Sequence, residues 1–366
     1  MNGSSTMILI GVGGAGCSIA QEVARGFGDG VRLAMFDTDA ASGGYAAEGE
    51  FFLVGGDRLS GQGSGGDIVG ARLAAEDSAE AIDAAFEGSR LAVVVTCLGG
   101  GTGGGATLET LKRLSRHGIP SIVFATTPFA FEGEKRLKNA RGIMSMIEEE
   151  ASAAFFLPLD KLVGGEDNMN EALARARDTL SSAISLFWRL VEKPGYIKLD
   201  EERLRQIISD AGRGRFAVAS ATGPDRAKKV ADALLSSPLL SDGSGPVKSI
   251  LCGVLAGDDL RLSEISDIAD TLKSAFGDKC AFDLATVNDE ENFAGRLSTV
   301  AMMFETAGGK AAGSDEAPQR TRHRHRVSSS AGSLVKGRFK NAEPTVWNGE
   351  NLDIPTYVRK SINIGR

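Results

Sequence analysis

Short apolar runs alternate with amphipathic stretches through the first part of the chain. The runs that have the length and apolarity of buried strands are 7–12, 31–37, 91–98, 121–128 and 153–159. Stretches with helical spacing lie between them, as at 16–25, 104–117 and 132–150. Apolar strands separated by helices are typical of a parallel sheet with both faces covered. The pattern predicts an α/β, Rossmann-like domain over residues 1–167.

A long helix and a second set of elements follow. Residues 168–193 are predicted to form one core helix, because no Gly or Pro interrupts them up to Val191. Later apolar runs predict strands at 214–220, 248–256, 279–287 and 297–304. Helical stretches alternate with these strands at 200–210, 224–236 and 262–275. A second, smaller α/β domain is therefore expected over residues 194–306.

The last part of the chain changes in composition. Residues 309–342 contain eight Lys or Arg against two acids, with few large apolar side chains. We therefore predict a disordered basic linker over 307–350, which serves either as a spacer or as a weak contact for anionic surfaces. Residues 351–366 regain apolar side chains, as in "NLDIPTYV". They are interpreted as a docking peptide rather than as a frayed end.

Composition argues against several classes of function. The formal net charge of −7 gives no sign of a nucleic-acid-binding protein. The four cysteines lie far apart, without a Cys-x-x-Cys pair or a Cys/His cluster, so neither a disulfide framework nor a metal site is expected. The sequence shows no secretory pattern, and no apolar run approaches the roughly 20 residues of a transmembrane helix. We expect a cytoplasmic protein.

Two glycine-rich segments stand at the carboxyl ends of predicted strands. The first glycine loop, "GVGGAGCS", covers 11–18, and the second, "GGGTGGG", covers 99–105. Ligands of doubly wound sheets bind at this edge, and successive amide groups at a helix start bind anions. Glycine lets a ligand approach the backbone, and Thr102 adds a hydroxyl donor. Two facing loops favour a triphosphate chain as the ligand.

A nicotinamide-dependent enzyme is the alternative that the first loop leaves open. "GVGGAG" matches G-x-G-x-x-G, and Asp37 or Asp39 stands at the end of the second predicted strand. Such an enzyme needs one pyrophosphate cradle, so the second glycine loop argues against it. The sequence contains no G-x-x-x-x-G-K-[ST], which excludes a P-loop protein.

The second glycine loop resembles the signature of the tubulin superfamily in its bacterial FtsZ form. Segments similar to FtsZ follow in order: "FDTDA" (36–40), "GQGS" (61–64), "TTPFAFEGEKRLKNARGI" (126–143) and "ATVNDEENFAGRLSTV" (285–300). The resemblance implies the tubulin/FtsZ fold and a GTP or GDP site, with Mg²⁺ held through the phosphates. The nucleotide-binding residues that it implies are Gly13, Gly14, Ala15, Gly16, Cys17, Ser18, Asp39, Gly63, Ser64, Gly100, Gly101, Thr102, Gly103, Gly104, Glu132, Arg136 and Arg177.

The resemblance also implies how the protein assembles. Members of the family stack head to tail, and a loop of one subunit completes the nucleotide site of the next. The expected partners are further copies of the chain, a standard FtsZ, and membrane-tethering division proteins. The last of these would bind residues 351–366, whose "LDIPTYVRK" is similar to the FtsZ C-terminal peptide. The protein would then act at the inner face of the membrane through partners.

The loop that would act on the neighbouring nucleotide departs from the family pattern. That pattern has Asn, then Asp two places on, then Asp three places further, where this chain has Lys198, Asp200 and Arg203. An Asp accepts a hydrogen bond from water, whereas an Arg has no acceptor. Asp200 is therefore the candidate acid. Lys198 and Arg203 are either counter-charges for the neighbour's γ-phosphate or solvent-facing helix residues.

The positions that read guanine in the family also differ. They correspond to Cys17, Ser18, Leu159, Leu173 and Arg177, or to Asp178 as the acid if the helix register moves by one residue. We expect phosphate binding to persist and guanine selectivity to be weakened. Two functions follow: a polymerising GTPase of the FtsZ type, or a paralogue that binds nucleotide and forms filaments while hydrolysing little.

Overall fold

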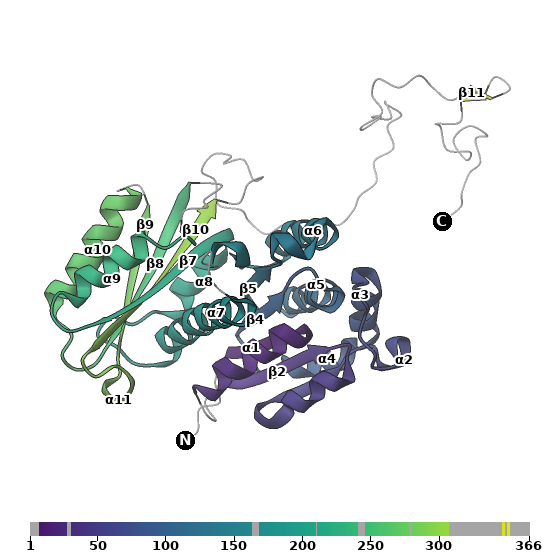
Figure 1. Ribbon diagram of the computed structural model, residues 1–366, viewed down its shortest axis with the longest axis horizontal. Coiled ribbons are helices and arrows are strands. Elements are labelled where there is room, and N and C mark those ends of the chain that lie inside the picture. The colour runs from purple at the N-terminus through teal and green to yellow at the C-terminus, as the bar shows by residue number, and fades with distance from the viewer. Residues whose placement is uncertain are drawn as a thin grey trace, which may run out of the picture. The chain divides into compact units, whose positions relative to one another are not determined.

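One ten-stranded sheet runs through the main part of the protein (Figure 1). The computed structural model describes residues 7–27, 31–162, 168–209, 211–240, 246–277 and 280–306, together with 346–347 and 350–351. The strands of the sheet are β1 (Met7–Val12), β2 (Arg32–Asp37), β3 (Glu50–Leu53), β4 (Leu91–Cys97), β5 (Ser121–Thr127), β6 (Ala153–Pro158), β7 (Ala211–Thr222), β8 (Val247–Ala256), β9 (Ala281–Asn288) and β10 (Arg296–Thr306).

Helices fill most of the intervals between these strands. The α-helices are α1 (Gly13–Arg25), α2 (Gly56–Leu59), α3 (Ile68–Asp77), α4 (Ala79–Ala85), α5 (Gly101–Arg116), α6 (Glu134–Glu150), α7 (Met169–Glu192), α8 (Glu201–Ser209), α9 (Arg226–Leu235), α10 (Leu262–Phe276) and α11 (Glu290–Phe293). Short 3₁₀ segments cover Ala40–Glu48, Ala130–Glu132 and Leu159–Lys161.

The first six strands form a doubly wound, parallel half of the sheet. Their order is β3-β2-β1-β4-β5-β6, and every neighbouring pair is parallel. The strand order reverses between β1 and β4, so the carboxyl ends of these two strands form a topological switch point. Both glycine loops begin there. The predicted α/β fold with a parallel nucleotide-binding sheet is confirmed.

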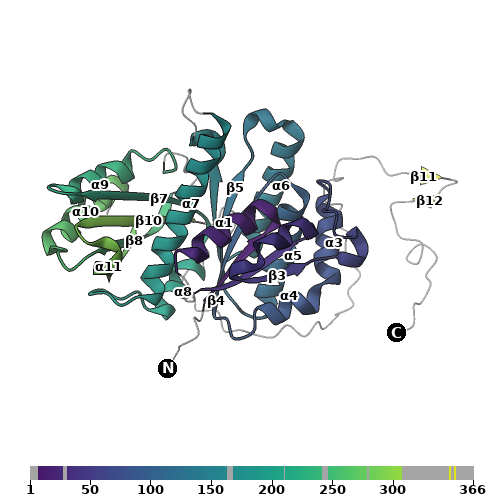
Figure 2. The same ribbon diagram turned by 60° about the horizontal axis from the view of Figure 1, so that its bottom comes forward.

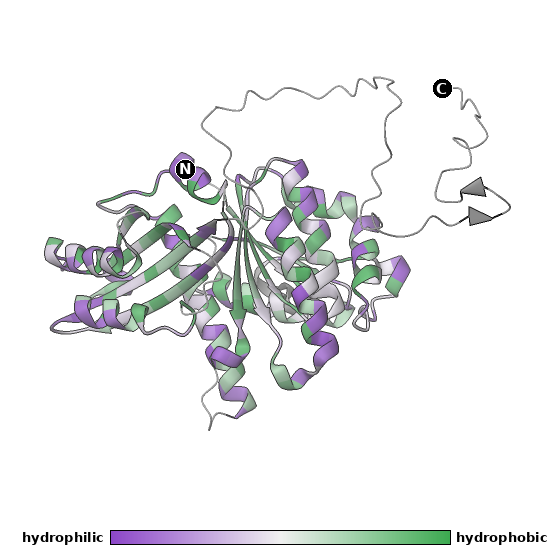
Figure 3. Ribbon diagram, turned by 90° about the horizontal axis from the view of Figure 1, so that it is seen from above, coloured by the Kyte–Doolittle hydropathy of each residue, from purple (hydrophilic) through white to green (hydrophobic). Residues whose placement is uncertain are grey.

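Helices cover both faces of this half. Side chains of β1 alternate between two cores: Leu9 belongs to the core that includes residues of α1 and α7, whereas Ile8 and Ile10 belong to the core that includes residues of α5 and α6. The hydropathy colouring shows an apolar sheet between helices whose outer faces are polar (Figure 3). Each of these fully buried aliphatic side chains stabilises the fold by roughly 1.5–3 kcal/mol. The packing fixes the ends of β1 and β4, where the site lies.

The long helix α7 lies between the two halves of the sheet (Figures 1 and 2). A capping box starts it: Asn168 accepts a hydrogen bond from the Glu171 N–H, and Glu171 accepts one from the Asn168 N–H. Its buried face includes Phe187 and Trp188. It packs on α1 at one side and on β7, β8, β9 and β10 at the other. The predicted core helix is therefore present, with bounds close to those expected.

The second half continues the same sheet. A short parallel register joins Ala154 to Arg213 and Phe155 to Gly214. Strand β10 is antiparallel to β7 and β8, while β9 is parallel to β8. Helices α9 and α10 cover one face over a third apolar core. The predicted strands and helices of this half are present, and the division into domains at 167 and 194 stays a prediction.

The sequence pattern did not predict the elements between β2 and β4, among them β3, α3 and α4. Strand β3 is an edge strand whose Phe51 and Phe52 are only half-buried, so its apolar signal is short. Helices α3 and α4 bury mostly alanines, among them Ala71, Ala74 and Ala75. Small side chains give little helical periodicity in hydrophobicity, although they allow close packing.

The chain after residue 310 forms a separate unit. Within it the structure describes β11 (Val346–Trp347) paired antiparallel with β12 (Glu350–Asn351). The other residues of the predicted linker 307–350 and docking peptide 351–366 lie outside the described residues. Among the helices that are described, none is long and apolar enough to cross a membrane.

Candidate functional site

Both glycine loops become the first turns of helices. Strand β1 ends at Val12 and α1 begins at Gly13, while β4 ends at Cys97 and α5 begins at Gly101. The predicted helix starts at 16 and 104 were therefore three residues late. The first turn of a helix has amide groups without intrahelical partners, and its dipole is positive. Two such amino ends meet at the switch point and form an anion-binding region.

Several glycines are required by packing within the protein itself. A Cβ on Gly16 would lie 2.6 Å from the carbonyl oxygen of Val95, and one on Gly103 would overlap the carbonyl of Cys97. Gly13 has a φ of +74° and lies against the backbone of Gly103. The glycines thus bring α1 and α5 close to β4 and to each other. Gly100 differs, because a Cβ there meets no protein atom within 4 Å.

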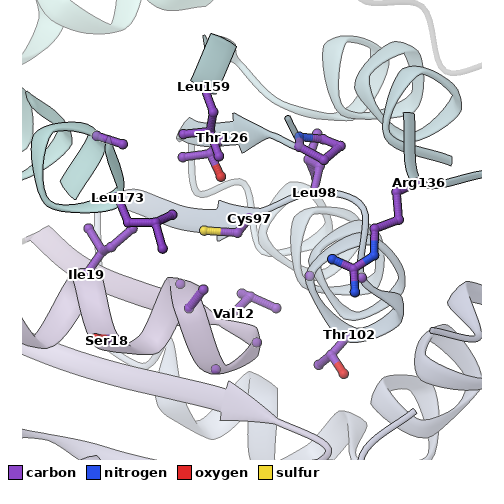
Figure 4. A pocket seen from close by; sticks show the side chains of 18 of the residues that line it. Val12, Ser18, Ile19, Cys97, Leu98, Thr102, Thr126, Arg136, Leu159 and Leu173 are labelled. Atoms are coloured by element: carbon purple, nitrogen blue, oxygen red, sulfur yellow. The ribbon is translucent and has the colours of Figure 1, made fainter. Parts of the chain in front are cut away.

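The two loops border a cavity of about 450 Å³ (Figure 4). This size lies within the range of small-molecule sites. We call it the glycine-lined cavity. Its lining comprises Val12, Gly13, Gly14, Ala15, Gly16, Ser18, Ile19, Cys97, Leu98, Gly100, Gly101, Thr102, Gly103, Thr126, Pro128, Glu132, Arg136, Leu159, Leu173, Ala176 and Arg177. Most of the residues that the sequence analysis proposed for nucleotide binding are therefore brought together.

Hydroxyl groups connect the second glycine loop to neighbouring loops. Thr102 Oγ1 lies 2.7 Å from Thr38 Oγ1 and 3.2 Å from Ser64 Oγ. Asp37 accepts hydrogen bonds from the Thr38 N–H and from Ser42 Oγ, at 2.7 and 2.6 Å. Burial raises the pKa of the Asp37 carboxyl, although these hydrogen bonds oppose the shift. This network orients the Thr102 hydroxyl at the amino end of α5.

Five of the predicted residues do not line the cavity. The Cys17 thiol is buried and donates to the carbonyls of Gly11 and Phe36, and burial raises its pKa. The Asp39 side chain accepts a hydrogen bond from the Ala41 N–H, and the Asp39 backbone forms an isolated antiparallel β-bridge with Gln62.

Gly63 donates its N–H to the Thr38 carbonyl, and Gly104 packs against Ile143. Ser64 Oγ forms a hydrogen bond with Thr102 Oγ1. The Cys17 side chain is thus directed to the protein interior. Gly104 likewise faces Ile143 in the interior, and not the cavity.

Two charged residues stand at one side of the cavity. Glu132 accepts the Phe129 N–H at 2.9 Å and pairs with Arg136 Nη1 at 2.5 Å. Arg136 is 58% exposed, and Figure 4 shows it on the same side as Thr102. A guanidinium that is paired once and open to solvent still has N–H groups for an anionic ligand. This side of the cavity suits phosphate groups.

The opposite side is apolar, and sequence reasoning found only part of it. Figure 4 shows Ile19, Leu159 and Leu173 there, with Cys97 between the two sides. Arg177 contributes the charged group, and its Nε is 3.6 Å from Glu22 Oε2. The lining residues that the analysis missed are Val12, Ile19, Cys97, Leu98, Thr126, Pro128 and Ala176. Five of them lie at the ends of predicted strands, whereas Ile19 and Ala176 lie within predicted helices.

The predicted catalytic residues lie outside this cavity. Asp200 is exposed just before α8 and accepts a weak hydrogen bond from the Glu202 N–H at 3.3 Å. Arg203 binds Asp283 of β9 through both carboxylate oxygens, at 2.6 and 2.9 Å. That ion pair raises the pKa of the Arg203 guanidinium. The side chain of Arg203 thus serves an intramolecular contact between α8 and β9.

The loop before Asp200 is held firmly against the second half of the sheet. The Ile197 N–H donates to Thr286 Oγ1 at 2.9 Å, and the Thr286 N–H donates to the Ile197 carbonyl at 2.8 Å. Gly195 packs so closely on the Thr286 carbonyl that a Cβ would overlap it. Lys198 and Asp200 are exposed beside this anchored backbone. The exposed side chains of Lys198 and Asp200 are therefore carried by backbone that hydrogen bonds hold to β9.

Comparison with known families and curated proteins gives consistent matches. Residues 6–165 match the model of the Tubulin/FtsZ family, GTPase domain, and residues 212–305 match that of the FtsZ family, C-terminal domain. The chain is 29% identical over 287 residues to a cell division protein FtsZ of Pseudomonas aeruginosa, covering 77% of this chain and 73% of that protein. It is 26% identical over 375 residues to the cell division protein FtsZ of Buchnera aphidicola subsp. Acyrthosiphon pisum, covering 98% of each.

Solved structures match the fold over most of the chain. An FtsZ dimer of M. jannaschii superposes with a TM-score of 0.76 at 23% identity, covering 85% of this chain and 95% of that one. CetZ2 from Haloferax volcanii, solved as a GTPγS-bound protofilament, has a TM-score of 0.69 at 21% identity, covering 82% and 93%.

Proposed function

Because this chain is a divergent FtsZ-like member of the tubulin superfamily, we propose that it binds GTP or GDP in the glycine-lined cavity and assembles head to tail into cytoskeletal filaments. The observation that carries the proposal is the meeting of two glycine-rich helix amino ends at the switch point of the sheet. The GTPase-domain match and the relatives named as cell division proteins support it. A GTPγS-bound protofilament with the same fold supports the mode of assembly.

The residues of the cavity fit a nucleoside triphosphate. The amide groups at the starts of α1 and α5, the Thr102 hydroxyl and the Arg136 guanidinium are the groups that would hold phosphate oxygens. No cluster of three or more His, Cys, Asp or Glu that would hold a metal occurs among the described residues. Any Mg²⁺ would therefore be bound chiefly through the phosphates and water.

Hydrolysis is proposed to be completed by the next subunit. Asp200 is exposed, sits outside the cavity of its own chain, and is carried by a loop that Thr286 anchors. A carboxylate there would accept a hydrogen bond from the attacking water and orient it toward the phosphate of the neighbour. Heterologous contacts of this kind produce open filaments when the rotation between successive subunits does not close a ring. The role of Arg203 is then to fix α8 to β9, since its guanidinium is bound by Asp283.

A second candidate is a filament subunit that binds nucleotide and hydrolyses little. Two features of the loop favour this second candidate: Asp200 is its one acid at the family positions, and Lys198 supplies donors and no acceptor. Such a subunit would form filaments alone or together with a standard FtsZ. Both candidates place the protein in cell division or a related constriction process. Residues 351–366 would then bind membrane-tethering division proteins.

Electron microscopy of the full chain with GTP, and with a slowly hydrolysed analogue, tests the assembly. We expect filaments with either nucleotide and none without nucleotide. Asp200→Asn is the matched variant, because it keeps the size of the side chain and removes its charge. It should still form filaments with GTP while phosphate release falls by about a hundredfold. Absence of filaments over a range of salt and pH would refute self-assembly.

A further inference from the structure

The side of the glycine-lined cavity opposite Thr102 and Arg136 is built mainly from aliphatic side chains. Ile19 comes from α1, Leu159 follows β6, and Leu173 comes from α7. Leu173 is 40% exposed although it lines a cavity. An apolar wall of this kind matches the flat face of an aromatic ring, which would remove the leucine from water. The base of a nucleotide is the part that fits this side.

The charged group on this side is a guanidinium. Arg177 lies one helical turn after Leu173, and both side chains line the cavity. Arg177 is linked to Glu22 of α1, whose carboxylate does not belong to the lining. The next residue, Asp178, is exposed and also outside the lining. The register of α7 thus turns a cation, and not an acid, toward the base side.

Carboxylate acceptors are missing from the base side as the structure describes it. Among the described lining residues the one carboxylate is Glu132, which binds the Phe129 N–H and Arg136 at the phosphate side. The side-chain hydroxyl groups of Ser18 and Thr126 also belong to the lining. A neutral hydroxyl is a weaker partner for a base N–H than a carboxylate is.

We infer that the base side binds a purine without reading its 2-amino group, so that guanine and hypoxanthine nucleotides bind almost equally; this rests on the proposed nucleotide site. Guanine offers O6 and N7 as acceptors, and both are shared with hypoxanthine. Its 2-amino group is a donor, and only an acceptor can distinguish it. The guanidinium of Arg177 has five N–H donors and no acceptor.

The size of the effect follows from the hydrogen bonds that a base can make. A site with a buried carboxylate facing the N–H groups of guanine would disfavour hypoxanthine, because the carboxylate keeps the N1–H partner and loses the 2-amino one. Arg177 gives the 2-amino group nothing, because a guanidinium has donors only. A neutral hydroxyl of Ser18 or Thr126 would add about 0.5 kcal/mol, or about twofold in affinity. The preference for guanine over hypoxanthine should therefore be within about threefold.

Titration calorimetry of the full-length protein with GDP and with IDP tests the inference. The native protein should bind the two with dissociation constants within about threefold of each other. Arg177→Asp introduces an acceptor at the same position and should raise the GDP preference to about tenfold or more. Arg177→Leu is the control, because it removes the donors without adding an acceptor. It should weaken both nucleotides by a similar factor and leave their ratio unchanged.

Each outcome separates the inference from the proposed function. A native preference for GDP of about thirtyfold or more would overturn the inference while supporting a nucleotide site. An unchanged ratio in a folded Arg177→Asp protein would overturn the assignment of Arg177 to the base side. Binding of neither nucleotide to the native protein would overturn the proposed function as well. Circular dichroism checks the fold of each variant, and if Arg177→Asp fails to fold, the native ratio decides.

Discussion

Gly100 is the position at which the cavity can be charged without disturbing the fold. It is the N-cap residue of α5, with φ −85° and ψ 171°, which is extended backbone that any residue adopts. It lines the glycine-lined cavity, and a Cβ on it meets no protein atom within 4 Å. Gly100→Asp therefore places a carboxylate in the cavity with little steric cost. An aspartate at Gly103 would instead overlap the Cys97 carbonyl, so that substitution would destabilise the fold and would not test the effect of charge in the cavity.

The stability of the ligand-free protein should rise slightly. Replacing glycine where the backbone is ordinary stabilises by about 0.4–1 kcal/mol through the unfolded state. Aspartate is also a better N-cap than glycine by a few tenths, and its charge favours the helix amino end by about 0.3–1 kcal/mol. The sum is about 1–2 kcal/mol, or an increase in melting temperature of roughly 2–6 °C for a protein of this size.

The affinity of the Gly100→Asp variant for nucleotide should fall sharply, because the added carboxylate is negatively charged. A carboxylate about 5 Å from a phosphate charge is repelled by about 3 kcal/mol at an effective dielectric constant of about 20. That energy corresponds to about a hundredfold loss of affinity. The added carboxylate also takes the amide groups at the start of α5 that the phosphate would use.

The assay is the melting temperature of each protein with and without GDP, because a ligand at 100 times its dissociation constant stabilises by about 2.7 kcal/mol. Gly100→Asn is the matched control, since it has the same size and capping ability without charge. The Asn variant should keep most of the stabilisation by GDP, and the Asp variant should lose it. Equal stabilisation of the Asp and Asn variants would refute the placement of phosphate at α5.

Three further predictions concern the rest of the protein. Asp283→Asn should loosen α8, lower the urea midpoint and reduce GTP hydrolysis more than it reduces GDP binding, because it weakens the anchor of Arg203; equal losses in both would contradict this role. Asp37→Asn should remove a pH dependence of stability, because burial raises the pKa of the Asp37 carboxyl above its ordinary 3.8 and the native state holds the proton more tightly than the unfolded state does. The free energy of unfolding of the native protein should therefore rise relative to that of the variant as pH falls toward 3.8. A constant difference in free energy of unfolding between the two proteins across that pH range would be evidence against it. Arg226→Ala should destabilise by about 3 kcal/mol, because it leaves the largely buried Glu264 carboxylate without its cation and with only the Arg261 N–H as a partner; chemical unfolding that shows less than about 1 kcal/mol would mean that water replaces the arginine.

The central strands of the parallel half were predictable because they are buried on both faces. Residues 7–12 and 91–98 read as continuous apolar runs, and these become β1 and β4 with their fully buried side chains. The starts of α1 and α5 were less predictable, since glycine has low helix propensity and masks the first turn. The sequence analysis consequently interpreted as loops what are the first turns of these helices. The chemistry predicted for the glycines was nonetheless that of helix amino ends.

The contacts between distant side chains lay beyond sequence reasoning. The pairing of Arg203 with Asp283 joins residues 80 positions apart, and no local pattern announces it. The same holds for Thr38 and Thr102, which are separated by 64 positions. In contrast, the placement of Arg177 at the cavity follows from helical spacing, because residues four apart share a face. Register within an element is therefore predictable, whereas partners across elements require the fold.

Phosphate release from GTP, measured per subunit over a wide range of protein concentration, tests the central claim most directly. The account divides the active site between the glycine-lined cavity of one subunit and Asp200 of the next. It therefore predicts a rate near zero at low concentration and a steep rise above a threshold, at which filaments appear. A rate per subunit that is measurable at high dilution and constant across concentrations would contradict the shared site.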